Sequence, residues 1–536
     1  MHRVALMCVF GPCGMQDRDT MNSEISSKSS ARVKEEISTL FNTVFFSYGL
    51  GIAGLLVASL TTYFSTRLFS PEVYGQLSMV SMVAGIIQAV GFVWLGSALI
   101  RFGKEEYVET GGVHQTFQVR LILLSFIWLA TLPIFASAYF FAHGYLATWI
   151  GLSGGILWVI LLLLTVMVLT NELRGYLNIF GKYRQLAGGD LFSQIIKLAA
   201  VSFLFIHYGV SGIGWLIALT IGGMVAQSLY LLAWQERGNF HLGRTSGFQD
   251  RLRQTVRYSI PALGTSILGY IYAPIEIFLI RYFISIEAVG LFSMANVLNR
   301  IFSNFVMLFP GLTFPILQGL KGTGNSEAMR RYYQRIVPQA TILFAPFISM
   351  GLICMTPIMK FFLSERYHPA IGTLLILTYA EIPLLPTVLQ SSYSYIYDKV
   401  SQALWVMLLQ YGFELACYFI LIPRIGIEGA AWGWVAAYLA SAVLLTHYVS
   451  QEFGASLRPY FAIALSALLG MGALLLVWSK IPFGLQLLAV VGLIITAGIL
   501  TKVVKLFDRR DMEWVVAIGM PGFLHPLLGR LYRILG

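Results

Sequence analysis

Charged residues are scarce in this sequence: Asp, Glu, Lys and Arg occupy only 11% of its 536 positions. A soluble domain carries about 25% charged residues, whereas here hydrophobic residues make up 57% of the chain and the mean hydropathy is +0.74. These values exclude the soluble globular class. They predict an all-α integral membrane protein, because the apolar runs are continuous instead of alternating, and helices satisfy their own backbone hydrogen bonds in lipid.

Features typical of enzymes are also lacking. The four cysteines are scattered, with neither disulfide nor zinc spacing. No Gly-rich phosphate loop is present, and the one Asp-x-Asp motif lies in the polar N-terminal tail. The longest internal loops, near 235–257 and 311–336, are too short for a catalytic domain. We therefore expect no enzyme activity, no cofactor and no metal, which argues against a membrane-embedded glycosyltransferase or polymerase.

Long apolar runs recur along the chain, separated by short breaks of Gly, Pro or charged residues. A bilayer core of about 30 Å needs roughly 20 apolar residues per helix. We predict fourteen transmembrane helices on this basis. Their spans are 43–66, 76–100, 121–142, 154–173, 186–207, 211–234, 258–280, 291–310, 337–359, 371–394, 402–423, 429–449, 459–479 and 484–501.

The net charge of +11 is explained by membrane orientation and not by nucleic-acid binding. Basic residues gather on the side of the membrane that the positive-inside rule assigns to the cytoplasm. This distribution predicts a multi-pass protein of the cell membrane with both termini cytoplasmic. Lys197 and Arg300 fall within predicted spans, and six basic residues fall on the outer side: Arg67, Arg281, Lys360, Arg366, Arg424 and Lys480.

One pattern, Ser-x-Glu-x-x-Gly-x-x-Ser-Met, occurs twice between long apolar runs, at an offset of 215 residues. Farther along, IFGKYRQ at 179–185 matches IYDKVSQ at 396–402. A near-constant offset over six spans indicates duplication. Because six is even, the two copies enter the membrane with the same orientation and are related by a pseudo-twofold axis along the membrane normal. Gly75 and Gly290 of the repeated pattern are expected to permit tight turns.

The repeat sets the expected organisation of the chain. Residues 1–42 form a cytoplasmic tail, unless Met21 is the true start, and residues 502–536 form an amphipathic basic segment along the inner leaflet. Between them lie the first six-helix bundle (43–235), a cytoplasmic linker (236–257), the second bundle (258–450) and two further helices (451–501).

Polar residues inside the predicted spans are candidates for function, because a charge at membrane depth costs at least about 2.5–3.5 kcal/mol unless it meets a partner or a wet cavity. Span 291–310 carries such residues at helical spacing, and span 186–207 carries a smaller set. We expect a water-filled, substrate-binding cavity, with interhelical bonding as the alternative. The residues are Ser293, Asn296, Arg300, Ser303 and Asn304, then Asp190, Gln194 and Lys197.

Carboxylates near prolines form a second group of candidates. A proline interrupts the helical ladder, and a buried carboxyl group prefers its neutral form, so protonation can be coupled to bending. Lys197 and Glu414 occupy equivalent positions in the two repeats and are expected to approach each other. We expect ion-coupling or ion-pair roles for Glu276, Glu381, Glu414 and Asp190, and hinge roles for Pro261, Pro274, Pro383 and Pro386.

Short motifs spread over nearly the whole chain give it a family resemblance. They are Arg67-Leu-Phe-Ser-Pro-Glu-Val-Tyr74-Gly75, Ala-Leu-Ile-Arg101-Phe-Gly, Phe-Gly-Lys182-Tyr, Tyr258-Ser-Ile-Pro261 and Leu506-Phe-Asp-Arg-Arg-Asp511. In these the chain resembles polysaccharide flippases, of the O-antigen and exopolysaccharide type, in the multidrug/oligosaccharidyl-lipid/polysaccharide exporter superfamily.

The resemblance implies a fold, a substrate and partners. It implies two six-helix bundles forming a V around a central cavity, with two extra helices. The implied activity is the movement of an oligosaccharide, linked by diphosphate to a polyprenyl lipid, from the inner to the outer leaflet by alternating access. Membrane lipid and polysaccharide polymerase or export machinery are the implied partners. A cation-coupled drug or metabolite antiporter of the same superfamily is the nearest alternative.

Overall fold

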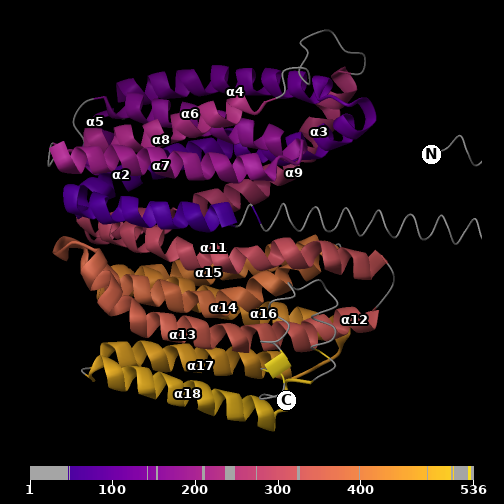
Figure 1. Ribbon diagram of the computed structural model, residues 1–536. Helices are drawn as coiled ribbons and strands as arrows, with labels where there is room; N and C mark the ends of the chain where they lie inside the picture. The colour runs from indigo at the N-terminus through magenta and orange to yellow at the C-terminus, as the bar shows by residue number, and fades with distance from the viewer. Residues whose placement is uncertain are drawn as a thin grey trace, which may run out of the picture.

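The chain is described by a computed structural model that is helical throughout its regular elements (Figure 1). The described residues are 46, 49–141, 143–151, 155–207, 212–235, 248–272, 274–322, 326–397, 399–479, 481–508, 511, 529–530 and 532. The predicted N-terminal tail, 1–42, lies outside them.

Twelve helices within the described ranges are long and apolar enough to cross a membrane, so the chain is a multi-pass membrane protein. The two predicted spans missing from the twelve are 258–280 and 291–310, and fourteen spans therefore stay a prediction. The helices of the first part are Gly49–Leu68, α2 (Pro71–Gly91), α3 (Gly96–Thr110), α4 (His114–Phe141), α5 (His143–Ile150), α6 (Ile156–Ile179), α7 (Tyr183–His207) and α8 (Ile213–Ala233).

The remaining helices are α9 (Phe248–Tyr272), α10 (Ile275–Phe283), α11 (Ile286–Gly322), α12 (Ser326–Arg331), α13 (Val337–Phe362), α14 (Ala370–Ile396), α15 (Val400–Ile425), α16 (Ile427–Phe453), α17 (Arg458–Trp478) and α18 (Phe483–Val503). The helices from α13 onward follow the predicted spans closely, but two earlier predictions were wrong. Helices α9 and α10 replace one continuous helix, and α11 and α12 occupy much of the stretch 311–336 that was predicted as a loop.

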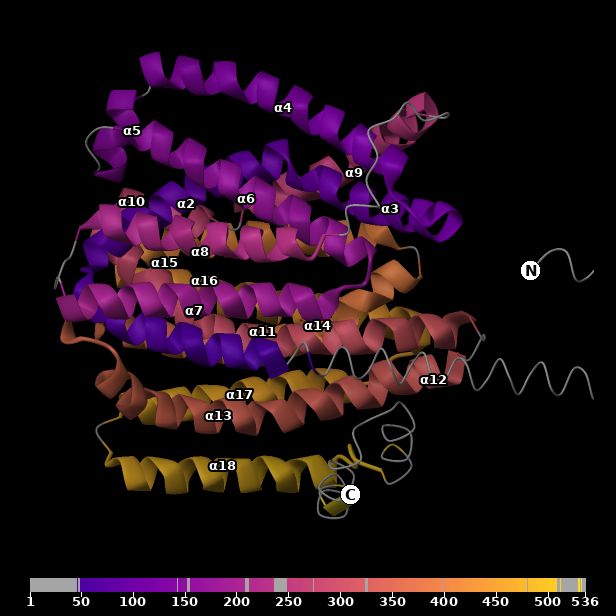
Figure 2. The same ribbon diagram turned by 45° about the horizontal axis from the view of Figure 1, so that its top comes forward.

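The helices form two groups that lie one above the other in Figure 1. The N-terminal half, Gly49–Leu68 with α2 to α8, is held together by packing of α2, α6, α7 and α8. The C-terminal half, α10 to α16, is built around α14, which packs against α11, α13 and α16. The helices α4 and α18 lie at opposite edges of the molecule in Figures 1 and 2, and both expose most of their apolar surface.

Helix α9 departs from the predicted organisation. The second bundle was expected to begin at residue 258, yet α9 begins at Phe248 and packs against α2, α3 and α4 of the N-terminal half. Figures 1 and 2 both show it beside α3. After the break at Pro274, α10 packs against α11 and α15 of the C-terminal half. The expected single span is therefore divided between the two halves.

Several described residues of the C-terminal segment are buried against other helices, whereas the sequence predicted an amphipathic basic segment lying along the inner leaflet. Asp511 is fully buried and Tyr532 is 3% exposed. Gln339 of α13 donates a 2.9 Å hydrogen bond to Asp511 and accepts one of 2.6 Å from the Tyr532 hydroxyl. Buried polar partners of this kind attach the end of the chain to α13. Residues 512–528 lie outside the described part.

Candidate functional site

The two copies of the repeated pattern meet where α2 and α11 begin. A Cβ atom added at Gly75 would lie 1.9 Å from the carbonyl oxygen of Ile286, and one added at Gly290 would lie 1.7 Å from that of Pro71. Ile286 is the repeat equivalent of Pro71, so the contact is reciprocal. The prediction of tight turns was wrong: both glycines lie inside helices, and neither has a positive φ. They permit two helix backbones to touch.

Two arginines extend this contact between the halves. Arg67, at the end of helix Gly49–Leu68, donates a 3.0 Å hydrogen bond to the carbonyl oxygen of Phe362 in α13. Arg281, near the end of α10, donates one of 2.9 Å to that of Trp149 in α5. Each arginine thus bonds to the opposite half. They are 214 residues apart, one less than the repeat offset of 215, so they lie at nearly equivalent places in the two repeats without being exact counterparts.

At the other end of the molecule the halves of the repeat meet through α3 and α9. Arg251 of α9 lies 3.6 Å from the Glu105 carboxylate of α3. The Arg101 guanidinium lies 4.8 Å from the Tyr258 ring centroid, and hydrogen bonding to Tyr258 and Glu105 raises the pKa of Arg101. Glu105 is about half exposed and Arg251 is 15% exposed, so these contacts involve side chains that can rearrange without moving a helix backbone. The α3–α9 contact is therefore easier to open than the backbone contact at the opposite end.

The polar residues of α11 fall into two sets, one that bonds to α14 and one that is exposed. Asn299, which the sequence analysis missed, donates a 2.8 Å hydrogen bond to the Glu381 carboxylate of α14. The Ser303 hydroxyl donates to the same carboxylate oxygen, and Thr378 donates to Asn299 at 3.2 Å. Glu381 is 1% exposed, and its other oxygen has no hydrogen-bond partner. Asn299 and Ser303 are spaced four residues apart, which was the available signal.

Arg300 and Asn304 are exposed on α11. Neither makes a hydrogen bond or ion pair with any described residue. Arg300 lies fourteen residues into the helix, about 21 Å along its axis, which is near mid-membrane depth if α11 crosses the bilayer. Asn296 is partly exposed one turn earlier, and the Ser293 hydroxyl is buried without a partner. This part of α11 offers a cation and amides to a bound group.

Glu276 and Glu414 come together inside the C-terminal half. They are 3% and 6% exposed, lie within electrostatic range of each other, and Tyr418 donates a hydrogen bond to Glu414. Neither forms an ion pair with a basic residue in the described ranges. Two buried carboxylates that interact with each other and lack a basic partner form a site that attracts a cation. The first turn of α10, which holds Glu276, favours negative charge through the helix dipole.

Of the three candidate polar residues of α7, Asp190 alone has hydrogen-bond and ion-pair partners among the described residues. Asp190 forms a 2.5 Å ion pair with Arg174 and accepts a hydrogen bond of 2.5 Å from Gln227. The Lys197 side chain lies across Gly223 of α8, where an added Cβ would meet it at 2.1 Å. Lys197 and Glu414, expected to approach each other, form no ion pair. Gln194 is partly exposed without a described partner.

The predicted hinge prolines behave differently from one another. Pro274 separates α9 from α10, whereas Pro261 falls inside α9. Pro383 and Pro386 lie inside α14, which continues through them from Ala370 to Ile396. The Pro383 carbonyl accepts a 2.9 Å hydrogen bond from the Thr387 hydroxyl, so a backbone group near the prolines is satisfied by a side chain. A helix break is thus present only at Pro274 among these four.

The described residues contain no cluster of three or more His, Cys, Asp or Glu side chains that could hold a metal ion. The arrangement instead combines an unpaired cation, amides and buried carboxylates at the junction of two related helical halves, which is typical of a membrane transporter.

Comparisons with solved structures support this class at the level of the fold. The chain is similar to the lipid II flippase MurJ in an inward closed conformation, with 14% identity and a TM-score of 0.63 over 85% of this chain and 98% of that one. An inward-facing multidrug resistance MATE transporter of the MOP superfamily gives 14% identity and a TM-score of 0.55, over 74% of this chain and 94% of that one. The Vibrio cholerae MATE transporter VcmN gives 16% identity and a TM-score of 0.52, over 78% of this chain and 99% of that one.

Residues 65–372, more than half of the sequence, match the family model described as polysaccharide biosynthesis protein. The chain belongs to this polysaccharide biosynthesis protein family, and its fold is that of MOP-superfamily transporters and not of an enzyme. The resemblance inferred from its motifs is thereby confirmed. No curated protein matches the sequence.

Proposed function

We propose that this protein flips a polyprenyl-diphosphate-linked oligosaccharide across the cell membrane by alternating access, for export of a surface polysaccharide such as an O-antigen or exopolysaccharide. The single observation that carries the proposal is Arg300, a cation on α11 that forms no hydrogen bond or ion pair with the residues that the structure describes. Helix α11 packs against both α2 and α14, so Arg300 belongs to the helix that joins the halves. A diphosphate is the anion that such a guanidinium binds by charge-assisted hydrogen bonds.

The two ends of the molecule support alternating access. The end at which α2 and α11 begin is closed by backbone contact and two arginines, and the other end by the α3–α9 contact. With both termini cytoplasmic, as the charge bias predicts, the first is the outer end. In this assignment α9 and α10 together form one further span and α11 forms another. Added to the twelve helices that are long and apolar enough to cross a membrane, they give fourteen.

The test of the substrate proposal is the variant Arg300→Ala. We expect it to lower export of the lipid-linked glycan at least tenfold while membrane abundance stays normal, and Arg300→Lys to retain part of the activity because the charge remains. Analysis of the lipid-linked glycan that accumulates in the inner leaflet of cells carrying the variant measures this. Normal export by Arg300→Ala at normal abundance would refute the role of this residue.

We also propose that Glu276 and Glu414 couple transport to a proton or cation gradient. Both are buried and interact electrostatically, and neither has a basic partner among the described residues, which supports this role. Glu276→Gln is expected to reduce transport when a proton gradient drives it, and much less when only the substrate gradient does. Proteoliposomes with and without an imposed pH gradient measure the difference, and an unchanged response to the gradient would reject the proposal.

A drug or metabolite antiporter is the second candidate, and the same carboxylate pair favours it, because organic cations require carboxylates. Deletion of the gene separates the two functions. A flippase leaves its lipid-linked glycan in the cytoplasmic leaflet, whereas an antiporter leaves the cell sensitive to cationic drugs with normal surface polysaccharide.

A further inference from the structure

A pocket with a volume of about 420 Å³ lies between Phe46 and the start of helix Gly49–Leu68 on one side and α7 and α8 on the other. None of the residues named above as substrate or coupling candidates lines it. The lining residues are Phe46, Leu50, Arg184, Gln185, Gly188, Leu191, Phe192, Ile195, Tyr230 and Trp234. No acidic side chain is among the ten.

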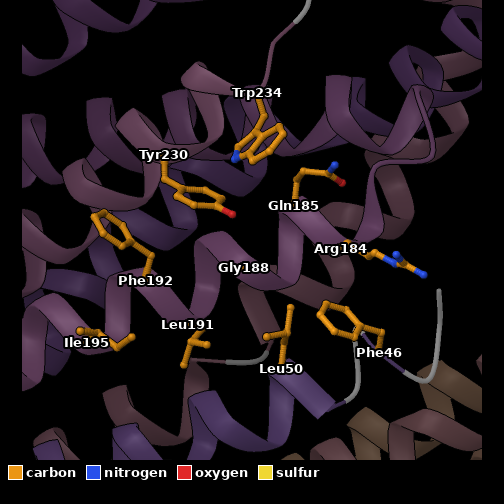
Figure 3. A pocket seen from close by; sticks show the side chains of 10 residues that line it. All are labelled: Phe46, Leu50, Arg184, Gln185, Gly188, Leu191, Phe192, Ile195, Tyr230 and Trp234. Atoms are coloured by element: carbon orange, nitrogen blue, oxygen red, sulfur yellow. The ribbon is translucent and has the colours of Figure 1, made fainter. Parts of the chain in front are cut away.

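The polarity of the pocket changes along its length. Figure 3 shows Arg184 and Gln185 toward one end and Phe192 and Ile195 toward the other. From Arg184 to Ile195 the distance along α7 is about 16 Å. An amphiphile has this same distribution, with a polar head and an apolar tail. The pocket therefore matches a lipid in polarity better than it matches a water-soluble solute.

The Arg184 guanidinium is available to a ligand. It is exposed, and within the described part of the chain its one recorded interaction is a cation–π contact of 5.2 Å with Phe46. Trp234 lies near Gln185 toward this end, whereas Tyr230 lies farther along the pocket, where its ring stacks on Phe192 at 5.5 Å (Figure 3). Both residue types prefer the membrane–water interface. A basic, aromatic-lined pocket between membrane helices near the interface suits a lipid phosphate.

The equivalent place in the C-terminal half lacks this chemistry. At the repeat offset of 217, Ser401 stands in place of Arg184 and Trp405 in place of Gly188. A Cβ at Gly188 would lie 2.6 Å from the Tyr230 hydroxyl, so the glycine lets Tyr230 pack against α7 as part of the pocket wall, at a position where the other half has a bulky indole. The pocket is thus a property of one half and not of the duplicated fold.

We propose that this pocket binds an anionic phospholipid from the adjacent leaflet, with its phosphate on Arg184 and an acyl chain along Leu191 and Ile195. A phospholipid fits better than the lipid-linked glycan because the pocket has one cation and no further polar side chain beyond Gln185 and the two interface aromatics. The proposal does not rest on the transported substrate, since its test measures lipid binding alone.

The test uses the full-length protein in nanodiscs of phosphatidylcholine containing a minor fraction of phosphatidylglycerol, with retained lipid counted by native mass spectrometry. Arg184→Gln is expected to weaken retention of phosphatidylglycerol about tenfold, the effect of one charge-assisted hydrogen bond. Gly188→Leu is expected to lose the lipid without any change of charge. The matched control is Arg253→Gln, which removes an exposed arginine of α9 outside the pocket.

Three results would overturn the proposal. Equal losses in Arg184→Gln and Arg253→Gln would mean that only general surface charge attracts the lipid. Equal retention of phosphatidylcholine and phosphatidylglycerol by the unaltered protein would exclude recognition of an anion. Displacement of phosphatidylglycerol by polyprenyl diphosphate at a much lower concentration would reassign the pocket to the transported lipid. Because Arg184→Gln changes no packed residue, it remains informative if Gly188→Leu fails to fold.

Discussion

At the scale of single residues, two glycines decide how the halves meet. Gly75 and Gly290 leave no room for a Cβ against the carbonyl oxygens of Ile286 and Pro71. Any larger residue would have to push α2 and α11 apart, and the backbone atoms on the opposite side cannot rotate away as a side chain can. The identity of these residues is therefore fixed by a helix–helix contact.

The variant Gly75→Ala tests this. Forced overpacking typically costs about 1–3 kcal/mol, so we expect a lower melting temperature in detergent and reduced transport. The matched control is Gly85→Ala in the same helix, where an added Cβ meets no atom within 4 Å; it should be neutral or slightly stabilising, by at most about 1 kcal/mol. Identical melting curves for the two variants would contradict the close contact.

A buried ion pair illustrates a residue whose role is structural. Arg120 of α4 is 4% exposed and its Nε donates a 2.8 Å hydrogen bond to the Glu172 carboxylate of α6. The pair neutralises a charge that would otherwise be isolated in the helix bundle. Arg300 contrasts with it, because no carboxylate of the described residues faces that guanidinium. The contrast is what separates a structural cation from a candidate binding cation.

At the scale of elements, the break between α9 and α10 is the most consequential feature. A proline has no N–H to donate and restricts the residue before it. Here Pro274 precedes α10, and the helices on its two sides pack against different halves of the protein. A change in the angle at this break would move α9 relative to α3 without unfolding either helix.

Pro274→Ala is expected to favour one continuous helix in place of α9 and α10. Helix α9 would then leave α3, and spin labels at the exposed positions Lys104 and Gln254 would move apart. A tenfold change in the ratio of two conformers corresponds to only about 1.4 kcal/mol. We therefore expect transport to fall about tenfold. Pro133→Ala, within α4, is the control. An unchanged distance distribution in Pro274→Ala would show that the proline does not set the break.

At the scale of the whole molecule, the two ends are closed by different chemistry. One end has reciprocal backbone contacts and two arginine-to-carbonyl bonds across the halves, whereas the other has side-chain contacts between α3 and α9. Side chains can change rotamer, whereas two touching backbones separate only if a helix moves. This difference predicts that the α3–α9 end opens first.

A cross-link tests whether that opening is required. In a chain with its native cysteines replaced, the pair Glu105→Cys and Arg251→Cys should form a disulfide or bifunctional cross-link that stops transport, with activity restored by reduction where a disulfide has formed. The control pair, Arg335→Cys and Asp508→Cys, joins residues 3.4 Å apart that both follow α11 in the chain, and should leave transport intact. Full transport by the cross-linked α3–α9 pair would contradict opening at this end.

The sequence by itself determined the membrane class, the positions of most helices and the duplication. These follow from local composition, because a stretch of apolar residues long enough to cross a bilayer forms a helix whatever its neighbours are, and a repeated offset is visible without coordinates. It also singled out Arg300, Glu276 and Glu381, since a polar residue in an apolar run is conspicuous on its own.

Only the tertiary structure decided which of these polar residues meet. Asn299 and Ser303 bond to Glu381, Glu276 lies beside Glu414, and Lys197 packs on Gly223. Pairing depends on how helices from distant parts of the chain are rotated and placed, and helical periodicity fixes the spacing of residues on a face but not the neighbour that the face meets. For the same reason the sequence could not show that α9 packs against the other half, or that two glycines expected in turns hold two helices together.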